Sequence, residues 1–282
     1  MSQWQLIFDA ARCNSCNNCV LATKDEYLFN RHEGYSAPAP QHGDLWFSLK
    51  RHERGAAPMI DVTHYPDTCF QCADAPCIIE ATRDAISQRA DGVVIIDPVK
   101  AQGRPELVEA CPYGKIHWNE EEQVAQKYSL DAHLLDAGWP EPRAVQVCPT
   151  RALYAVKASD SEMDSVAADE GLSQPPAAKG ARSRLWFRNA EALTSQFLGG
   201  TVVRVTDGRE DCVAGARVRL SAAAGATSYD GVTDAFGDFR LDGIASDQRE
   251  MTLQVLDADG DVRFEQVVTM LQSRWVGVIE IG

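Results

Sequence analysis

The stretch Cys13-Asn14-Ser15-Cys16-Asn17-Asn18-Cys19 decides the fold of this chain, because it places three thiols on one short loop. The 282-residue chain has nine cysteines, and eight of them follow one pattern. A second run of three lies further along the chain, and two single cysteines are each followed by proline. These residues are Cys69, Cys72 and Cys77 in the second run, and Cys111 and Cys148 before Pro112 and Pro149.

Eight thiols in this pattern supply the ligands of two four-iron, four-sulfur clusters. A cubane cluster needs four thiolates at the corners of a tetrahedron, and three cysteines on one turning loop can take three corners. The fourth must come from elsewhere, because a short loop cannot wrap the far side. Proline suits a loop that stops just after donating its sulfur, since it fixes φ and has no N–H. The pattern therefore predicts two [4Fe-4S] clusters and a role in electron transfer.

Zinc and disulfides are the competing uses of these cysteines. Zinc also binds four thiolates, but usually as two separated pairs, which triplets with distant partners fit poorly. Disulfides need an oxidising compartment and usually a signal peptide. Residues 1–9 have no basic region and only a short apolar run, so they do not resemble a secretory signal. We expect a cytoplasmic location, although a partner's export signal could carry a folded complex across a membrane.

Charge and composition exclude further classes. The formal net charge is −14 and the sequence pI is about 4.8. Nucleic-acid binding normally needs a basic patch, and the densest positive run, at 50–54, suits a solvated face or an acidic partner surface instead. No run approaches the roughly 18–20 apolar residues of a membrane helix. We therefore predict no nucleic-acid partner and no direct membrane insertion.

The chain is expected to contain two domains and a connection. Residues 1–156 hold every candidate ligand, and the predicted strands 4–8, 92–98 and 152–156 with a short helix at 106–110 suggest an α+β ferredoxin-like domain. Residues 30–68 are interpreted as a long insertion that binds a partner or packs over the clusters. The acidic, Pro-containing segment 157–198 is interpreted as a linker with one helix at most.

Residues 199–282 have the pattern of an all-β sandwich. Alternating stretches at 201–205 and 216–220 are separated by Asp-Gly turn signals. The run 233–241 resembles the transthyretin-like or carboxypeptidase-regulatory-like sandwich, which indicates a fold and almost nothing about function. Cys212 is the one cysteine of this region, and with no histidine or lysine nearby to activate it, an inert thiol is expected.

The cysteine runs and Cys-Pro pairs resemble the iron–sulfur subunit of the dimethyl-sulfoxide-reductase family of molybdenum enzymes. That subunit is a doubled ferredoxin with four cysteine motifs and, in its full form, four clusters. Eight motif positions lack cysteine here. They hold Thr23, Ala81, Ala101, Arg104, Leu107, Tyr128, Asp131 and Ala144. The resemblance implies that these are two complete ligand sets, whose pockets other side chains fill.

In that family, cysteine motifs one and four together hold two clusters, and motifs two and three together hold the other two. The resemblance therefore also implies how the eight remaining cysteines are divided between clusters. It groups Cys13, Cys16, Cys19 and Cys148 around one cluster, and Cys69, Cys72, Cys77 and Cys111 around the other. A third cluster on Asp131 and Thr23 is the alternative, because aspartate can replace one thiolate. Tyr128 and Ala144, at the other two positions of this ligand set, are poor ligands for such a cluster.

Within that family, the strongest resemblance is to the small (beta) subunits of the pyrogallol–phloroglucinol transhydroxylase and resorcinol-type hydroxylase group. It is carried by four stretches: residues 13–19, 111–114, 118–127 and 132–136. The chain departs from the transhydroxylase pattern in motif four, where the cysteines of a third cluster are lost. The resemblance implies a heterodimer in which a large subunit carries a molybdenum–pterin cofactor and hydroxylates or transhydroxylates hydroxylated aromatics in anaerobic degradation.

This chain would then carry electrons to or from the molybdenum site, and we expect no catalytic residue in it. A free-standing ferredoxin-type carrier is one alternative. A structural or binding subunit with the clusters as staples is another. Three cations lie close in sequence to ligands or vacated positions and are interpreted as ordinary surface charges, with tuning of cluster potential as the alternative: Arg12, Lys115 and Lys127.

Overall fold

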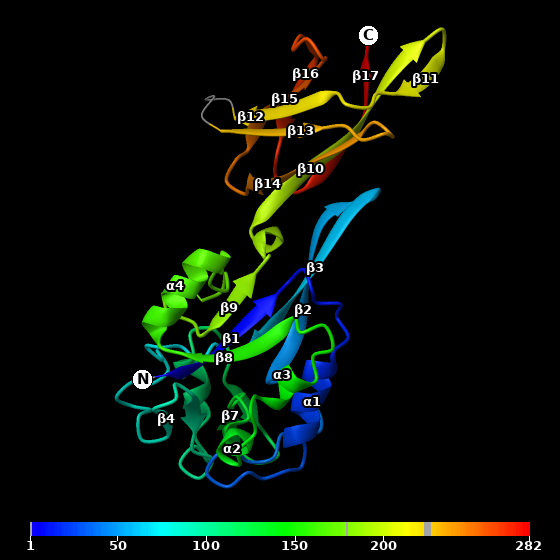
Figure 1. The fold of residues 1–282 in the computed structure, drawn as a ribbon. Helices are drawn as coiled ribbons and strands as arrows, with labels where there is room; N and C mark the ends of the chain where they lie inside the picture. The colour runs from blue at the N-terminus through cyan, green and yellow to red at the C-terminus, as the bar shows by residue number, and fades with distance from the viewer. Residues whose placement is uncertain (1, 179, 223–226) are drawn as a thin grey trace. The chain divides into compact units, whose positions relative to one another are not determined.

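The computed structural model describes residues 2–178, 180–222 and 227–282 (Figure 1). The chain divides into two compact units; the first mixes short strands and helices with long loops, and the second is built mostly from strands. Unit 1 comprises Met1–Arg51 and His64–Ala190, and unit 2 comprises His52–Thr63 and Glu191–Gly282. All eight candidate cluster cysteines lie in unit 1, and Cys212 lies in unit 2. Among the helices of the described residues, none is long and apolar enough to cross a membrane.

Unit 1 is organised around β1 (Gln3–Asp9), which lies in the middle of a three-stranded sheet. Its neighbours are β8 (Leu153–Ala158), which is antiparallel, and β9 (Leu185–Arg188), which is parallel. Residues 4–9 are all buried, as expected of a central strand covered on both faces. The sheet fixes the start of the first cysteine loop, because that loop leaves β1 directly after Asp9.

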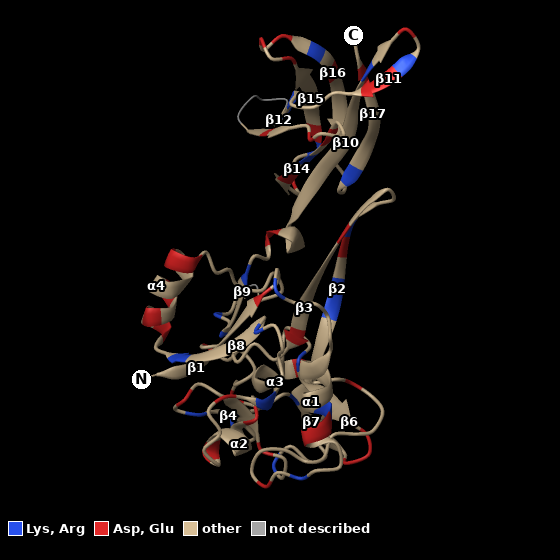
Figure 2. Cartoon of the chain, turned by 45° about the vertical axis from the view of Figure 1, so that its right-hand side comes forward, with Lys and Arg blue, Asp and Glu red and all other residues tan. Residues whose placement is uncertain are grey.

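Helix α4 (Asp160–Glu170) covers one face of this sheet. Its N-terminus has a capping box, in which Ser159 and Glu162 satisfy each other's backbone N–H groups, and it ends at Gly171 with φ of 65°. Met163 packs with Ile7 and Trp186 in a small core. The helix also carries acidic residues, coloured red in Figure 2, and most of them are exposed. The segment 157–198, interpreted above as a linker, thus contains a helix and the sheet strand β9, followed by η2 (Glu191–Leu193).

A second core of unit 1 lies among short elements. Two small hairpins and a 3-10 helix surround Ile86, Val94, Leu107 and Val124. The hairpin strands are β4 (Ile86–Gln88) with β5 (Val94–Ile96), and β6 (His117–Asn119) with β7 (Val124–Gln126); the helix is η1 (Pro105–Ala110). Three short α-helices complete the unit: α1 (Asn18–Tyr27), α2 (Ala132–Asp136) and α3 (Arg143–Gln146).

The long insertion predicted at 30–68 contains a two-stranded hairpin, β2 (Phe47–Ala56) and β3 (Met59–Thr68). Residues 52–63 at its tip belong to unit 2. There the buried guanidinium of Arg54 pairs with Asp61 and Asp242 and lies 5.3 Å from the centre of the Phe197 ring. Burial of an Arg requires such pairing, because an unpaired buried charge is costly.

The rest of unit 2 consists of two four-stranded sheets. In one, β10 (Ser195–Thr206) pairs with β11 (Arg209–Cys212), β14 (Asp238–Ala245) and β17 (Arg274–Ile281). The other has the order β13 (Ser228–Val232), β12 (Arg217–Ala222), β15 (Glu250–Leu256), β16 (Val262–Thr269). Alternate side chains of both sheets, among them Val218, Leu241 and Leu253, share one hydrophobic core.

Candidate metal centres

The first quartet of cysteines lines one pocket of unit 1. Cys13, Cys16 and Cys19 come from the loop between β1 and the first turn of α1, and Cys148 follows α3. Apolar side chains close the same pocket: Phe8, Phe47, Leu49, Pro66 and Leu153. Four sulfurs facing one apolar pocket are a suitable donor set for an iron–sulfur cluster.

The backbone of the first loop explains how three thiols of one segment point inward. Ser15 and Asn17 have φ of 57° and 60°, in the left-handed region that non-glycine residues rarely adopt. These two left-handed residues turn the backbone of the loop. Cys13 and Cys16 then line the pocket from the loop, and Cys19 lines it from the first turn of α1. Helix α1 begins immediately after Asn17. The strain of two left-handed residues within three positions is concentrated at the candidate site.

The second quartet is brought together in the same way. Cys69 follows β3, Cys72 and Cys77 lie on the next turns, and Cys111 follows η1. Burial, together with the charges of the other three thiols, raises the pKa of Cys72 to about 12, which places all four cysteines near one another. Gln71, between the first two cysteines, has φ of 49°, so this loop repeats the left-handed residue that Ser15 provides in the first.

The two Cys-Pro segments form matching turns. In each, the residue three positions after cysteine is left-handed, Gly114 with φ of 62° and Arg151 with φ of 52°. In each, that residue's N–H donates to the cysteine carbonyl oxygen, over 3.1 Å and 3.2 Å. In each, a later backbone N–H lies 3.4 Å from the cysteine Sγ: that of Lys115 for Cys111, and that of Leu153 for Cys148. Such N–H groups stabilise a sulfur that carries negative charge.

Four thiols cannot ionise together in these pockets without a positive group between them. Burial, with a smaller contribution from the neighbouring thiols, raises the pKa of Cys19 to about 12 and that of Cys77 to about 11. A bound metal centre reverses this balance, because a coordinating thiol is deprotonated outright. The donor set, its burial and the N–H groups aimed at Sγ therefore fit a metal centre. All nine cysteines are free of disulfides.

The positions vacated in motifs two and three are held together by Arg104. Its guanidinium donates to the carbonyl oxygen of Ala81 over 2.8 Å and pairs with Asp84 over 2.8 Å. Ala101 and Leu107 are fully buried in the second core of unit 1. A guanidinium and packed aliphatic side chains thus take the space in which the resemblance would place a cluster.

The positions vacated in motifs one and four form a buried hydrogen-bonded network. Asp131 is fully buried and accepts hydrogen bonds from the hydroxyls of Tyr27 and Tyr128, over 2.9 Å and 2.8 Å, and from the backbone N–H of Arg143. Thr23 donates its hydroxyl to the carbonyl oxygen of Cys19. The alternative of a third cluster on Asp131 and Thr23 finds no support here, because both side chains already have partners and the Tyr128 ring fills the space.

The three cations singled out in the sequence have different surroundings. Lys115 pairs with Asp67, and Arg12 is exposed. Lys127 is only 4% exposed, and its ammonium donates to the carbonyl oxygens of Val94 and Tyr128. The interpretation of Lys127 as an ordinary surface charge is therefore wrong. Its side chain lies inside because these two carbonyl oxygens, one of them in β5, accept hydrogen bonds from its ammonium group.

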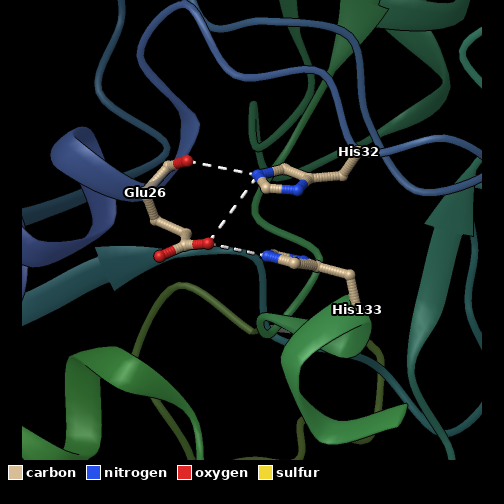
Figure 3. A group of neighbouring side chains, drawn as sticks. All are labelled: Glu26, His32 and His133. Atoms are coloured by element: carbon tan, nitrogen blue, oxygen red, sulfur yellow. Dashed lines mark hydrogen bonds and ion pairs between the residues drawn. The ribbon is translucent and has the colours of Figure 1, made fainter. Parts of the chain in front are cut away.

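The sequence analysis missed a group of side chains outside the quartets. Glu26, His32 and His133 lie together in unit 1, with ligand atoms within 4.8 Å of one another (Figure 3). His133 is 101 residues from His32 in the sequence, so no motif of fixed spacing predicts that these side chains meet. A weak signal exists only between Glu26 and His32, which lie within seven residues.

Comparison with known proteins agrees with this geometry. Residues 60–158 match a family model described as a 4Fe-4S dicluster domain. The pyrogallol hydroxytransferase small subunit of Pelobacter acidigallici is 35% identical over 285 residues, and the alignment covers 100% of both chains.

Two more distant relatives extend the comparison. A putative iron–sulfur subunit of dimethyl sulfoxide reductase from Halobacterium salinarum is 26% identical over 68% of this chain and 80% of its own length. The thiosulfate reductase electron transfer subunit of Salmonella typhi is 28% identical over 64% of this chain and 91% of its own. The chain therefore belongs to the family of the pyrogallol hydroxytransferase small subunit, among the iron–sulfur electron-transfer subunits of dimethyl-sulfoxide-reductase-type molybdenum enzymes.

Proposed function

We propose that this chain carries two [4Fe-4S] clusters and transfers electrons for a large molybdenum–pterin subunit that hydroxylates or transhydroxylates hydroxylated aromatics. One cluster would be held by Cys13, Cys16, Cys19 and Cys148, and the other by Cys69, Cys72, Cys77 and Cys111. The observation that carries the proposal is the gathering of Cys148 with the Cys13–Cys19 loop around one pocket. The full-length likeness to a hydroxytransferase small subunit supports the choice of partner.

The residues of this chain would bind the clusters, shield them and adjust their charge. The clusters themselves would supply one-electron chemistry. Phe8, Phe47 and Leu153 keep water from the first pocket, and the N–H groups of Lys115 and Leu153 face the ligand sulfurs. These are the features that set the potential of such centres, which spans roughly −700 to +450 mV.

The finer features of the fold are part of the same proposal. We infer a doubled ferredoxin in residues 1–156, supported by the two matching Cys-Pro turns. We infer a transthyretin-like sandwich in residues 199–282, supported by two sheets around one core. Residues 157–198 would join them, and the complex would work in the cytoplasm as a heterodimer.

The decisive experiment is the iron and acid-labile sulfide content of the chain, purified without oxygen from its native cells. We expect about eight irons and eight sulfides per chain, as two clusters of four require. Low-temperature electron paramagnetic resonance of the reduced protein should show two interacting centres. The chain should also co-purify with a much larger molybdenum-containing subunit. A fully loaded, stable monomer without that subunit would contradict the proposed partner, and zinc in place of iron would contradict the clusters.

A further inference from the structure

Glu26, His32 and His133 converge from three segments of unit 1 (Figure 3). Glu26 lies in the last turn of α1, His32 in the loop that follows, and His133 in α2. Glu26 Oε1 is 2.8 Å from His133 Nε2 and 3.8 Å from His32 Nε2. The two imidazole rings are stacked, with centroids 3.7 Å apart and planes inclined by 22°. One carboxylate oxygen and one nitrogen of each imidazole therefore lie within 4.8 Å of one another.

Neighbouring side chains hold this geometry and keep the carboxylate charged. Arg143 donates to Glu26 Oε2 over 2.6 Å, which leaves Oε1 directed at the histidines. Burial alone would raise the pKa of Glu26, but hydrogen bonds from His133 and Arg143 outweigh it and lower the pKa. Asp25 pairs with the same guanidinium over 2.6 Å and offsets its charge. The Tyr27 ring packs against both imidazoles, with centroids 5.4 Å and 5.6 Å away.

We propose that Glu26 Oε1, His32 Nε2 and His133 Nε2 bind a divalent transition metal of the zinc type, separately from the cysteine quartets. Two imidazoles and one carboxylate are an established three-ligand set for zinc, which leaves one open position. Zn–N and Zn–O bonds of about 2.0–2.2 Å place tetrahedral ligands about 3.3–3.5 Å apart. The observed O–N separations of 2.8 Å and 3.8 Å bracket this spacing, and the stacked imidazole rings must tilt for both nitrogens to face one metal ion.

The protons of the histidines can move to make room for the metal. Each Nε2 now faces an oxygen of Glu26: the side chain for His133, and the backbone carbonyl, at 3.1 Å, for His32. Metal binding needs each Nε2 lone pair, so each proton must shift to Nδ1 or leave. His133 Nδ1 is buried and has no hydrogen-bond partner in the protein, so a proton that shifts there needs a water molecule as its acceptor. A neutral imidazole can then change tautomer with no net loss of protons.

The three side chains are mostly buried, but each keeps some exposure to solvent, so a metal ion can reach them. The side chains of Glu26, His32 and His133 are 13%, 18% and 11% exposed. The orienting contact from Arg143 to Glu26 is the kind of outer interaction that positions a ligand carboxylate. The site contains no sulfur, which distinguishes it chemically from both quartets. It does not depend on the proposed electron transfer, so the two ideas can fail separately.

Zinc binding to the full chain tests the proposal. The protein is purified without oxygen with its clusters in place, dialysed against a weak chelator and titrated with Zn²⁺ by calorimetry. Zinc K-edge X-ray absorption then identifies the ligands. We expect one zinc per chain, bound by nitrogen and oxygen with two imidazoles and no sulfur. His32→Gln and His133→Gln should each weaken binding at least about 100-fold, since losing even an outer partner costs about 10- to 100-fold.

His42→Gln is the matched control, because His42 is exposed and outside the group. It should bind zinc as the unchanged chain does. Iron is measured in every sample, so that zinc replacing a cluster is recognised. The proposal is overturned if the unchanged chain binds no zinc, if sulfur is found in the zinc shell, or if both variants bind as tightly as His42→Gln. Should His133→Gln not fold, His32→Gln decides alone, because His32 lies in a loop.

Discussion

The ammonium group of Lys127 donates a hydrogen bond to the carbonyl oxygen of Val94, inside unit 1 and away from solvent. It also donates to the carbonyl oxygen of Tyr128. Burial raises the pKa of Cys77 to about 11, and Lys127 provides the largest opposing influence. Burial likewise raises the pKa of Cys111, which Lys127 also opposes. A buried cation that donates to two neutral oxygens therefore lies close to the second cysteine quartet.

Lys127→Met should lower the reduction potential of the cluster proposed on the second quartet. Reduction adds one electron to a centre that is already negative, so a nearby cation favours the reduced state. Coulomb's law with an effective dielectric of about 20 gives a shift on the order of 50–100 mV. An electrochemical titration followed by electron paramagnetic resonance would measure it. The reduction potential of the cluster proposed on the first quartet should change much less than that of the cluster proposed on the second.

Lys100→Met is the control for charge, because Lys100 is exposed and near Asp97. A surface cation is screened by water and salt, so this variant should leave both potentials nearly unchanged. Equal shifts in Lys100→Met and Lys127→Met would show that net charge alone acts. A potential that rises in Lys127→Met would contradict the argument. Iron content confirms that each variant keeps its clusters.

Cys148→Ser should damage one cluster and leave the other. Cys148 shares its pocket with Cys13, Cys16 and Cys19, so its loss would remove one of the four proposed ligands there. A hydroxyl is a far weaker ligand for iron than a thiolate. We expect loss of iron or conversion to a three-iron centre at that site, with an unchanged signal from the second quartet. Cys212→Ser, at an exposed cysteine in unit 2, should keep the full iron content. Loss of signal from the second quartet in Cys148→Ser would show that the sharing is different.

Leu220→Ala should destabilise unit 2 while both proposed clusters stay intact. Leu220 is fully buried in the core shared by the two sheets. Truncating a buried leucine to alanine typically costs about 2–5 kcal/mol. Leu271→Ala removes the same atoms from a side chain that is 70% exposed, and it should cost far less. Urea unfolding followed by tryptophan fluorescence would compare the two, with cluster absorbance recorded in parallel. Equal effects of the two substitutions would contradict this assignment of the core.

Much of the fold follows from local sequence. The strands expected at 4–8, 92–98, 152–156, 201–205 and 216–220 are confirmed in β1, β5, β8, β10 and β12. Apolar residues in these segments follow a clear strand pattern, because each strand has one or both faces buried. The short helix at 106–110 is confirmed in form, as the 3-10 helix η1.

What the sequence could not indicate depends on distant partners. β9 becomes a strand by pairing in parallel with β1, far away in the sequence, as in the register Ile7 with Trp186. The hairpin β2–β3 carries mixed polar residues, so its pattern resembles a loop, and its tip is held by Arg54. The inward turn of Lys127 and the meeting of Glu26 with His133 likewise arise only when remote segments pack together.

The network around Asp131 allows a prediction with a defined pH dependence. Burial raises the pKa of Asp131, although hydrogen bonds from Tyr128, Tyr27 and the backbone N–H of Arg143 oppose this. A carboxyl whose pKa is higher in the folded chain binds its proton more tightly there. Its contribution to stability is fully present below the unfolded pKa of about 3.9 and is lost as the pH rises through the folded pKa.

Asp131→Asn should destabilise unit 1, most strongly at low pH. The three donors around Asp131 would face an amide that offers only one acceptor oxygen, and each buried group left without a partner costs about 1–3 kcal/mol. Because asparagine does not titrate, the difference in unfolding free energy from the unchanged chain should shrink as the pH rises above the unfolded pKa of about 3.9. Oxygen-free urea unfolding at several pH values would measure this, with Asp169→Asn, at an exposed position of α4, as the control. A difference that grows with pH would show that folding lowers the pKa of Asp131, because stability would then rise with pH in the unchanged chain alone.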